Sequence, residues 1–312
     1  MQDLPSDVVR LVMASLGTRS LLSLASTCRE YRDLAAAMPL KPCMTARHNS
    51  RHYQRWLASR GVAARVQELT ARRSAWGPCP WLRDLPALTR LTVAFSRVTP
   101  RALVNVCDSI EHLDVHRVAP TFGTASFCTS VLARLPRLHT LRLAFAPGWD
   151  VVSVQGLPQH LRELVIRQAP LLLIRHAPRA DTLKLHACDG LVCGERLQSC
   201  LELDLACCDA SVPLAGMLPD DLSRLKSLRV ECPNRSTVPR LGEMTDLREL
   251  HLAFDSLVLA PADVPPRLEV LDVRARFAIG AAGPPVRRPD TLDAVRTELE
   301  GALTHAEDLF FV

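Results

Sequence analysis

Long apolar runs and targeting signals are lacking in this 312-residue chain. Uninterrupted apolar stretches such as residues 171–174 fall far short of the roughly 20 residues that a membrane-spanning helix needs. The first residues, Met1 to Leu4, lack the positively charged flank of a secretory signal peptide. We therefore expect an intracellular protein, in the cytoplasm, the nucleus or both, with no membrane partner.

Paired cysteines and catalytic motifs are lacking as well. The 11 cysteines are odd in number and none stands in a CxxC pair, so neither a disulfide framework nor a zinc knuckle is expected. His112 and His116 are four residues apart, but they flank a predicted strand and do not share a helix face. No phosphate loop, dinucleotide site or hydrolase elbow occurs. We expect no metal, no cofactor and no enzymatic activity.

What the chain does contain is an internal repeat. A six-residue pattern, apolar-x-x-apolar-x-apolar, recurs ten times, and the steps between its central leucines run from 19 to 28 residues. Leucine-rich repeats have periods of about 20 to 29 residues. The central leucines are Leu69, Leu91, Leu113, Leu141, Leu164, Leu183, Leu203, Leu228, Leu250 and Leu271. An eleventh copy, AEDLFF, begins at Ala306.

Each copy predicts one short parallel strand. Its first, fourth and sixth residues point into a core shared with neighbouring repeats, and the residues between them point outward. Two connecting segments, after Thr99-Pro100 and after Pro289-Asp290, have a helix start signal and predict helices on the convex side. Pairs such as Leu85-Pro86 lead directly into a strand and predict extended or turn-like connections.

Over residues 62–312 this pattern resembles the leucine-rich-repeat superfamily. The resemblance implies an α/β fold, a solenoid of about 10–11 repeats with parallel strands on its concave face. That face collects one exposed strand position from each repeat, and its mixed charge favours an unknown protein substrate, although scattered solvated charges would look the same. The candidate substrate-binding residues are Asp114, Arg142, Arg167, Lys184, Asp204, Arg229, His251 and Asp272.

The first forty residues carry more apolar helix face than so small a unit can bury. Apolar residues between Pro5 and Leu16 follow the spacing of one helix face, Gly17 stops that helix, and Thr18 can cap a second one. Leu24 falls partly outside the stripes that would meet inside a three-helix unit. Apolar surface is therefore left over.

This stretch resembles the F-box over residues 3–38, and we assign residues 1–40 to it. Leu4-Pro5, Asp7, Val8-Val9, Leu16, Leu21-Leu22, Cys28-Arg29 and Tyr31 have the order and spacing of the family pattern, with Tyr31 where Trp is more frequent and Ser20 where an acid is usual. The resemblance implies docking on a Skp-family adaptor, which joins the F-box to a cullin. The protein would then be the non-catalytic substrate receptor of a ubiquitin ligase. The candidate adaptor-binding residues are Leu4, Pro5, Val8, Val9, Val12, Leu16, Leu21, Leu22, Leu24, Cys28 and Tyr31.

Two other functions stay open. The helices could merely cap the open end of the repeats, which would leave a protein-interaction scaffold with no ligase role. Residues 41–75 carry eight basic residues against one acid, so the basic join, residues 41–61, could bind nucleic acid. The sequence favours an amphipathic helix there instead, with Trp56 and Leu57 inward, Arg55 in solvent and Gly61 at its end. We therefore do not expect nucleic acid as a partner.

Overall fold

The structure is a computed structural model of the chain, which divides into two compact units. The first comprises residues 1–125 and 131–148, and the second comprises residues 126–130 and 149–312. The residues that the structure describes are 9, 12–13, 15–27, 29–44, 55–57, 59–72, 75–76, 80–94, 97–98, 108–120, 126–174, 180–188, 192–193, 200–206, 218–231, 240–258 and 265–278. No helix within these ranges is long and apolar enough to cross a membrane.

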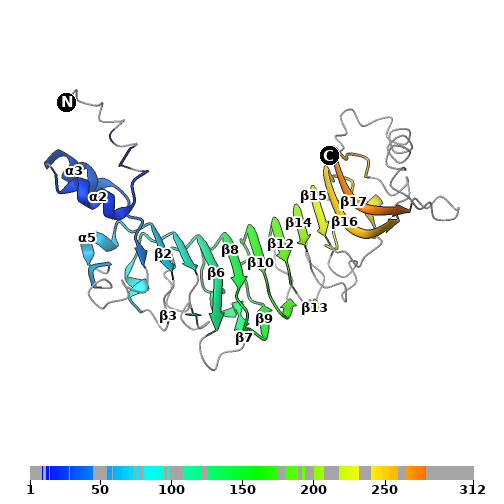
Figure 1. The fold of residues 1–312 in the computed structure, drawn as a ribbon, viewed down its shortest axis with the longest axis horizontal. Coiled ribbons are helices and arrows are strands. Elements are labelled where there is room, and N and C mark those ends of the chain that lie inside the picture. Colours follow the sequence, from blue (N-terminus) through cyan, green and yellow to red (C-terminus); the bar gives the residue numbers. More distant parts are fainter. Residues whose placement is uncertain are drawn as a thin grey trace. The chain divides into compact units, whose positions relative to one another are not determined.

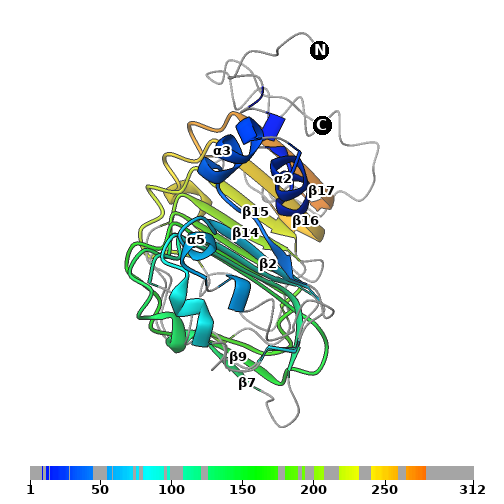
Figure 2. The same ribbon diagram turned by 90° about the vertical axis from the view of Figure 1, so that its left-hand side faces the viewer.

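The first unit begins with helices. The described residues among 9–15 are helical, and α2 (Thr18–Ala25) and α3 (Arg29–Ala37) follow and pack against each other (Figure 2). Gly17 occupies the N-cap position of α2 and makes no side-chain cap. The prediction that Thr18 caps this helix was wrong, because Thr18 is its first residue. Its hydroxyl oxygen instead accepts a hydrogen bond from the Lys41 backbone N–H at 2.9 Å.

The sheet of the first unit contains four of the predicted repeat strands, side by side and parallel (Figure 1). They are β2 (Glu68–Arg72), β4 (Arg90–Ala94), β6 (His112–Pro120) and β8 (Thr140–Phe145). Their central leucines are in register and at most 1% exposed, as the repeat pattern predicts. A short side sheet joins β3 (Ala75–Trp76) and β5 (Arg97–Val98) to the far end of β6.

This sheet starts earlier than the repeats do. Strand β1 (Cys43–Met44) pairs in parallel with β2, and Leu40 forms a bridge with Val66. The stretch that the sequence assigns to a helical join therefore opens with a strand. This strand lies along the open edge of β2 and forms hydrogen bonds with backbone groups there. Beyond it, residues 55–57 are helical and α5 spans Arg60–Ala63. Gly61 thus lies inside a helix, where the sequence predicted an end.

The second unit contains the other six predicted repeat strands. They are β10 (Glu163–Arg167), β12 (Thr182–His186), β14 (Glu202–Ala206), β15 (Ser227–Glu231), β16 (Glu249–Val258) and β17 (Val270–Ala278). All neighbours are parallel, and the central leucines again face one another in register and are at most 2% exposed. The leucine-rich-repeat solenoid is confirmed in both units.

A second parallel sheet of the same unit was not foreseen. Its strands, in spatial order, are β13 (Val192–Cys193), β11 (Leu172–Ile174), β9 (Val151–Val154) and β7 (Ser126–Cys128). Figure 1 shows β9 and β13 below β10 and β12. Buried Phe127 meets Trp149 edge to face, with ring centroids 5.6 Å apart. Buried Thr129 bonds both backbone groups of Gln155 through its hydroxyl at 2.9 Å.

The remaining described connections are short, as the proline pattern predicts. Before β4 the Leu88 N–H donates to the Leu85 carbonyl, and the same turn precedes β8, β10, β15, β16 and β17. Among the described residues, 3-10 helices also occur at Pro80–Asp84, Thr129–Leu132 and Leu241–Glu243. The two predicted helices and the eleventh repeat lie outside the described residues.

Candidate functional site

The N-terminal helices present an apolar surface to solvent. Val12 is 50% exposed and Leu22 is 41% exposed, although both are large aliphatic residues. Met13 and Leu21, their sequence neighbours in the same two helices, are each 1% exposed. The helices therefore have an inner apolar face that their own chain covers and an outer one that it does not.

A shallow hollow accompanies this surface along α2. It is lined by Leu16, Arg19, Ser20, Ser23, Leu24 and Thr27. Leu16 and Leu24 are half-buried. The Thr27 hydroxyl, in the turn after α2, donates to the Leu24 carbonyl at 2.7 Å, so this polar group has a partner within the chain. The hollow thus offers two aliphatic side chains beside hydroxyls.

The predicted adaptor-binding residues have different outcomes. Val9, Val12, Leu16, Leu22 and Leu24 retain exposed surface. Leu21 is 1% exposed, so its side chain packs within the chain, and its role at the adaptor stays a prediction. Leu4, Pro5, Val8 and Cys28 lie outside the described residues, and Tyr31 lies in α3 with its side chain undescribed.

The second candidate surface is the strand face. It is the side of the repeat strands that carries the first, third and fifth residue of each strand, counted from the strand's own first residue, which is the third residue of the six-residue pattern. In the first unit it consists of Glu68, Thr70, Arg72, Arg90, Thr92, Ala94, His112, Asp114, His116, Thr140, Arg142 and Ala144. In the second unit it consists of Glu163, Val165, Arg167, Thr182, Lys184, His186, Glu202, Asp204, Ala206, Ser227, Arg229, Glu231, Glu249, His251, Ala253, Val270 and Asp272. Every predicted substrate-binding residue lies on this face.

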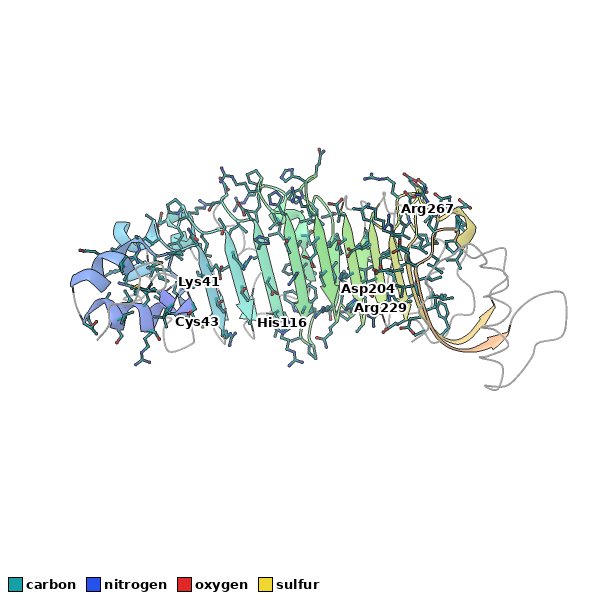
Figure 3. The ribbon with its side chains drawn as sticks, turned by 90° about the horizontal axis from the view of Figure 1, so that it is seen from above. Lys41, Cys43, His116, Asp204, Arg229 and Arg267 are labelled. Atoms are coloured by element: carbon teal, nitrogen blue, oxygen red, sulfur yellow. The ribbon has the colours of Figure 1, made fainter. Side chains whose placement is uncertain are left out.

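Several of these residues contact one another in the second unit. Asp204 Oδ2 lies 2.9 Å from His186 Nε2, and Asp204 Oδ1 lies 4.0 Å from Arg229 Nε. Asp204 and Arg229 are opposite each other on β14 and β15 (Figure 3). The Arg229 Nε–H donates to Glu231 Oε1 at 3.0 Å, and this hydrogen bond is the main reason why the pKa of Arg229 is raised.

The pairing continues on the last two strands, where His251 Nδ1 is 3.4 Å from Asp272 Oδ2. Four of the predicted substrate-binding residues are therefore engaged with neighbours on the same face. Arg167 is exposed and Lys184 is half-buried beside them. Sequence alone identified the positions of these side chains, but the pattern did not reveal their partners.

In the first unit, Asp114 and Arg142 stand opposite each other on β6 and β8. His112 and His116 both project outward from β6, while Leu113 and Val115 between them are fully buried. Burial lowers the pKa of His112, and the nearby cations Arg90 and Arg142 lower it further. Within the described ranges no group of three His, Cys, Asp or Glu side chains could hold a metal ion.

The cysteine at a repeat turn is structural. Cys188 is fully buried, and its thiol lies 3.7 Å from the Ile166 carbonyl oxygen as a weak donor. Burial also raises the pKa of the Cys200 thiol to about 12. The Cys200 thiol therefore stays protonated at neutral pH. Of the other described cysteines, Cys43 is exposed and Cys128 is half-buried.

Comparison with known proteins bears on the N-terminal helices. The family model of the F-box domain matches residues 1–42. The chain carries an F-box domain. No curated protein matches the chain. Among solved structures, a leucine-rich-repeat protein of Leptospira interrogans is similar over 80% of this chain and 67% of its own, with 13% sequence identity and a TM-score of 0.42. The leucine-rich-repeat assignment rests on the spacing and register of the strands themselves.

The F-box is tied to the first repeat by hydrogen bonds. The Arg65 guanidinium, just before β2, donates to the Met38 carbonyl from Nε at 3.1 Å and from Nη2 at 3.0 Å, and also to the Ala35 carbonyl. These carbonyls belong to the end of α3, where helical carbonyls lack partners within the helix. Burial lowers the pKa of Arg65, but the side chain stays charged. Sequence reasoning missed this contact because it joins residues about thirty positions apart.

Proposed function

We propose that this protein is the substrate-recognition subunit of a Skp–cullin–F-box ubiquitin ligase. Its F-box docks on a Skp-family adaptor, which links it to a cullin, and its repeats hold the protein to be ubiquitylated. The observation that carries the proposal is an F-box domain whose Val12 and Leu22 are exposed although the repeats beside it are already covered.

The presence of two apolar faces on the N-terminal helices, one buried and one exposed, favours docking over capping. A helical cap needs one apolar face, turned toward the repeats, whereas an adaptor-bound helical unit needs a second face for its partner. Met13 and Leu21 supply the inner face, and Val12 and Leu22 supply the outer one. Strand β1 also covers the N-terminal edge of β2, so the repeats have a cover that does not depend on the exposed flank.

The proposed receptor performs no chemistry of its own. In such a ligase it raises the effective concentration of the substrate near the ubiquitin-charged enzyme, which requires that its two binding surfaces keep a defined separation. Arg65 and strand β1 support this role, because they fix the F-box to the first repeat. A flexible tether would spread the substrate over a larger volume and lower that concentration.

The strand face supports substrate binding. A stable protein interface needs roughly 800 Å² on each partner, which several adjacent repeats can supply. Mixed charges such as Asp114, Arg142, Lys184 and Asp204 favour a protein surface over an apolar small molecule.

Adaptor binding tests the proposal. The double variant Val12→Ser, Leu22→Ser removes exposed apolar surface and should weaken binding of a Skp-family adaptor at least tenfold, by roughly 1.4 kcal/mol or more, with little change in thermal stability. Ala36→Ser, at an exposed position of α3, is the control and should bind normally. If the double variant binds the adaptor normally but loses thermal stability, the helices are a cap and the chain is a leucine-rich-repeat scaffold.

A further inference from the structure

We infer that Lys226 is a ubiquitin acceptor, the lysine at which this receptor is itself modified within the assembled ligase. The inference deepens the proposed function by naming a modification site, and it rests on that function for its source of activated ubiquitin. It comes from the scarcity of lysine in the chain and from the surroundings of each lysine that is present.

Lysine is rare in this chain, and every copy can be located. Only three of the 38 basic residues are lysine, namely Lys41, Lys184 and Lys226, and all three lie among the described residues. A lysine amine can accept ubiquitin, whereas the guanidinium of arginine keeps its proton and is no nucleophile. The arginines that supply the remaining positive charge are therefore not acceptors, and the choice among side-chain amines is limited to three.

Lys41 is exposed but engaged. Its Nζ lies 3.1 Å from Glu68 Oε1, in a pair whose lysine side chain is 47% exposed. Its backbone N–H donates to the Thr18 hydroxyl oxygen, which holds this residue against the F-box. An exposed ion pair of this kind lowers the population of the free amine by up to about fivefold. Lys41 is therefore a slower acceptor than a lysine without a partner.

Lys184 lies inside the proposed substrate surface. It is the third residue of β12, between Val165 on β10 and Asp204 on β14, and it is half-buried. A substrate docked on the strand face would cover it. Its amine is therefore less accessible in the free receptor and hidden in the loaded one.

Lys226 has neither restriction. It is exposed, and its ammonium has no ion pair or hydrogen bond with any residue that the structure describes. Its backbone is fixed at the entry to β15: the N–H donates to the Leu201 carbonyl at 2.8 Å, and the carbonyl accepts from the Arg248 and Glu249 N–H groups at 2.9 and 3.1 Å. A free amine thus projects from a rigid position at the margin of the strand face, beside the place where a docked substrate would present its own lysines.

The transfer needs nothing beyond what the proposed ligase supplies. The Lys226 ammonium loses one proton to solvent, and the amine attacks the thioester carbonyl carbon that joins the C-terminus of ubiquitin to a cysteine of the charged enzyme. A C–N bond forms as the C–S bond breaks, the cysteine leaves as a thiolate, and the remaining excess proton on nitrogen returns to that sulfur. The assembly keeps receptor and charged enzyme together, so the reaction benefits from proximity.

The test uses the full chain with purified adaptor, cullin assembly, conjugating enzyme and ubiquitin, and it maps the modified lysines by mass spectrometry. Lys226→Arg should lower the rate of receptor modification by at least about fivefold, whereas Lys41→Arg and Lys184→Arg should each change it less than about twofold. A variant in which arginine replaces all three lysines gives the background. Because arginine keeps the charge, all these variants should melt as the unaltered protein does.

Arg162 offers a matched position for moving the acceptor. It is exposed, it immediately precedes β10 as Lys226 precedes β15, and its carbonyl accepts from the Thr182 N–H on the next strand in the same way. The double variant Lys226→Arg, Arg162→Lys should regain at least about half of the lost modification, now at position 162. Failure to regain it would show that exposure does not select the amine, and would overturn the inference.

A small acyl donor tests accessibility without the ligase. At low conversion by N-hydroxysuccinimidyl acetate, Lys226 should be acetylated at least about threefold faster than Lys41 or Lys184. Equal acetylation of the three amines, mapping of ubiquitin mainly to Lys41 or Lys184, or an unchanged rate in Lys226→Arg would each overturn the inference. Adaptor binding is measured on the same preparations. If the adaptor binds and Lys226 receives no ubiquitin, the inference is wrong and the receptor function survives; if the adaptor does not bind, both are wrong.

Discussion

Removing the Arg65 guanidinium should loosen the F-box from the first repeat. The variant Arg65→Met keeps the aliphatic stem and deletes three hydrogen bonds to the carbonyls of Ala35 and Met38. Hydrogen bonds to charged groups contribute about 1.5–3 kcal/mol where water is excluded. Arg65 is half-buried and water can replace part of the loss. We therefore expect a total cost of about 2 kcal/mol.

The effect should be local, so amide hydrogen exchange is the suitable measurement. Amides of α3 should exchange about 30-fold faster in the variant, which corresponds to about 2 kcal/mol of opening free energy. Amides of β14 in the second unit should keep their rates. Arg65→Lys should restore less than half of the protection, because one ammonium cannot reproduce the planar fork.

Arg72→Met serves as the control, because Arg72 is exposed on the neighbouring strand β2. Its exchange rates should match those of the unaltered protein. If Arg65→Met changes α3 exchange less than threefold, the guanidinium contacts do not hold the F-box, and β1 alone must do so.

Three further experiments test the fold. Ala187 has a left-handed φ of 51°, so Ala187→Gly should stabilise the protein by about 1 kcal/mol in urea unfolding, whereas Ala36→Gly within α3 should destabilise it by about the same amount. Leu113→Ala should cost about 3 kcal/mol because the side chain is fully buried, against less than about 0.5 kcal/mol for exposed Leu22→Ala; similar costs would contradict the core assignment. The lowered pKa of His112 means that the unfolded chain binds its proton first as pH falls, so stability should drop below about pH 6.5 and His112→Gln should flatten that part of a urea-midpoint profile.

The repeat strands could be predicted from the sequence because each leaves the same local pattern. All ten central leucines, from Leu69 to Leu271, are buried and in register within their units. Strand β1 left no such signal: it has two residues, and Pro42 precedes it. The second sheet was missed for the same reason, because strands of two to four residues are too short for a period-two pattern.

The candidate surfaces were predictable in position and not in their contacts. An apolar surplus in the first forty residues indicated an exposed face, and Val12 and Leu22 form it. The pattern could not separate Leu21 from Leu22, since adjacent helical residues point in different directions and the docking of α2 against α3 decides which is buried. Partners such as His186 for Asp204 depend on which strands become neighbours, and the fold alone sets that.

Adaptor binding by the exposed face of the F-box tests the central claim most directly. Binding of a purified Skp-family adaptor to the full chain, to the variant Val12→Ser, Leu22→Ser and to the control Ala36→Ser can be measured by titration calorimetry. We expect tight binding by the full chain and the control, and at least tenfold weaker binding by the double variant with its melting temperature preserved. If the folded full chain does not bind the adaptor, the N-terminal helices are not an adaptor-docking site and the protein is not a receptor of this ligase class.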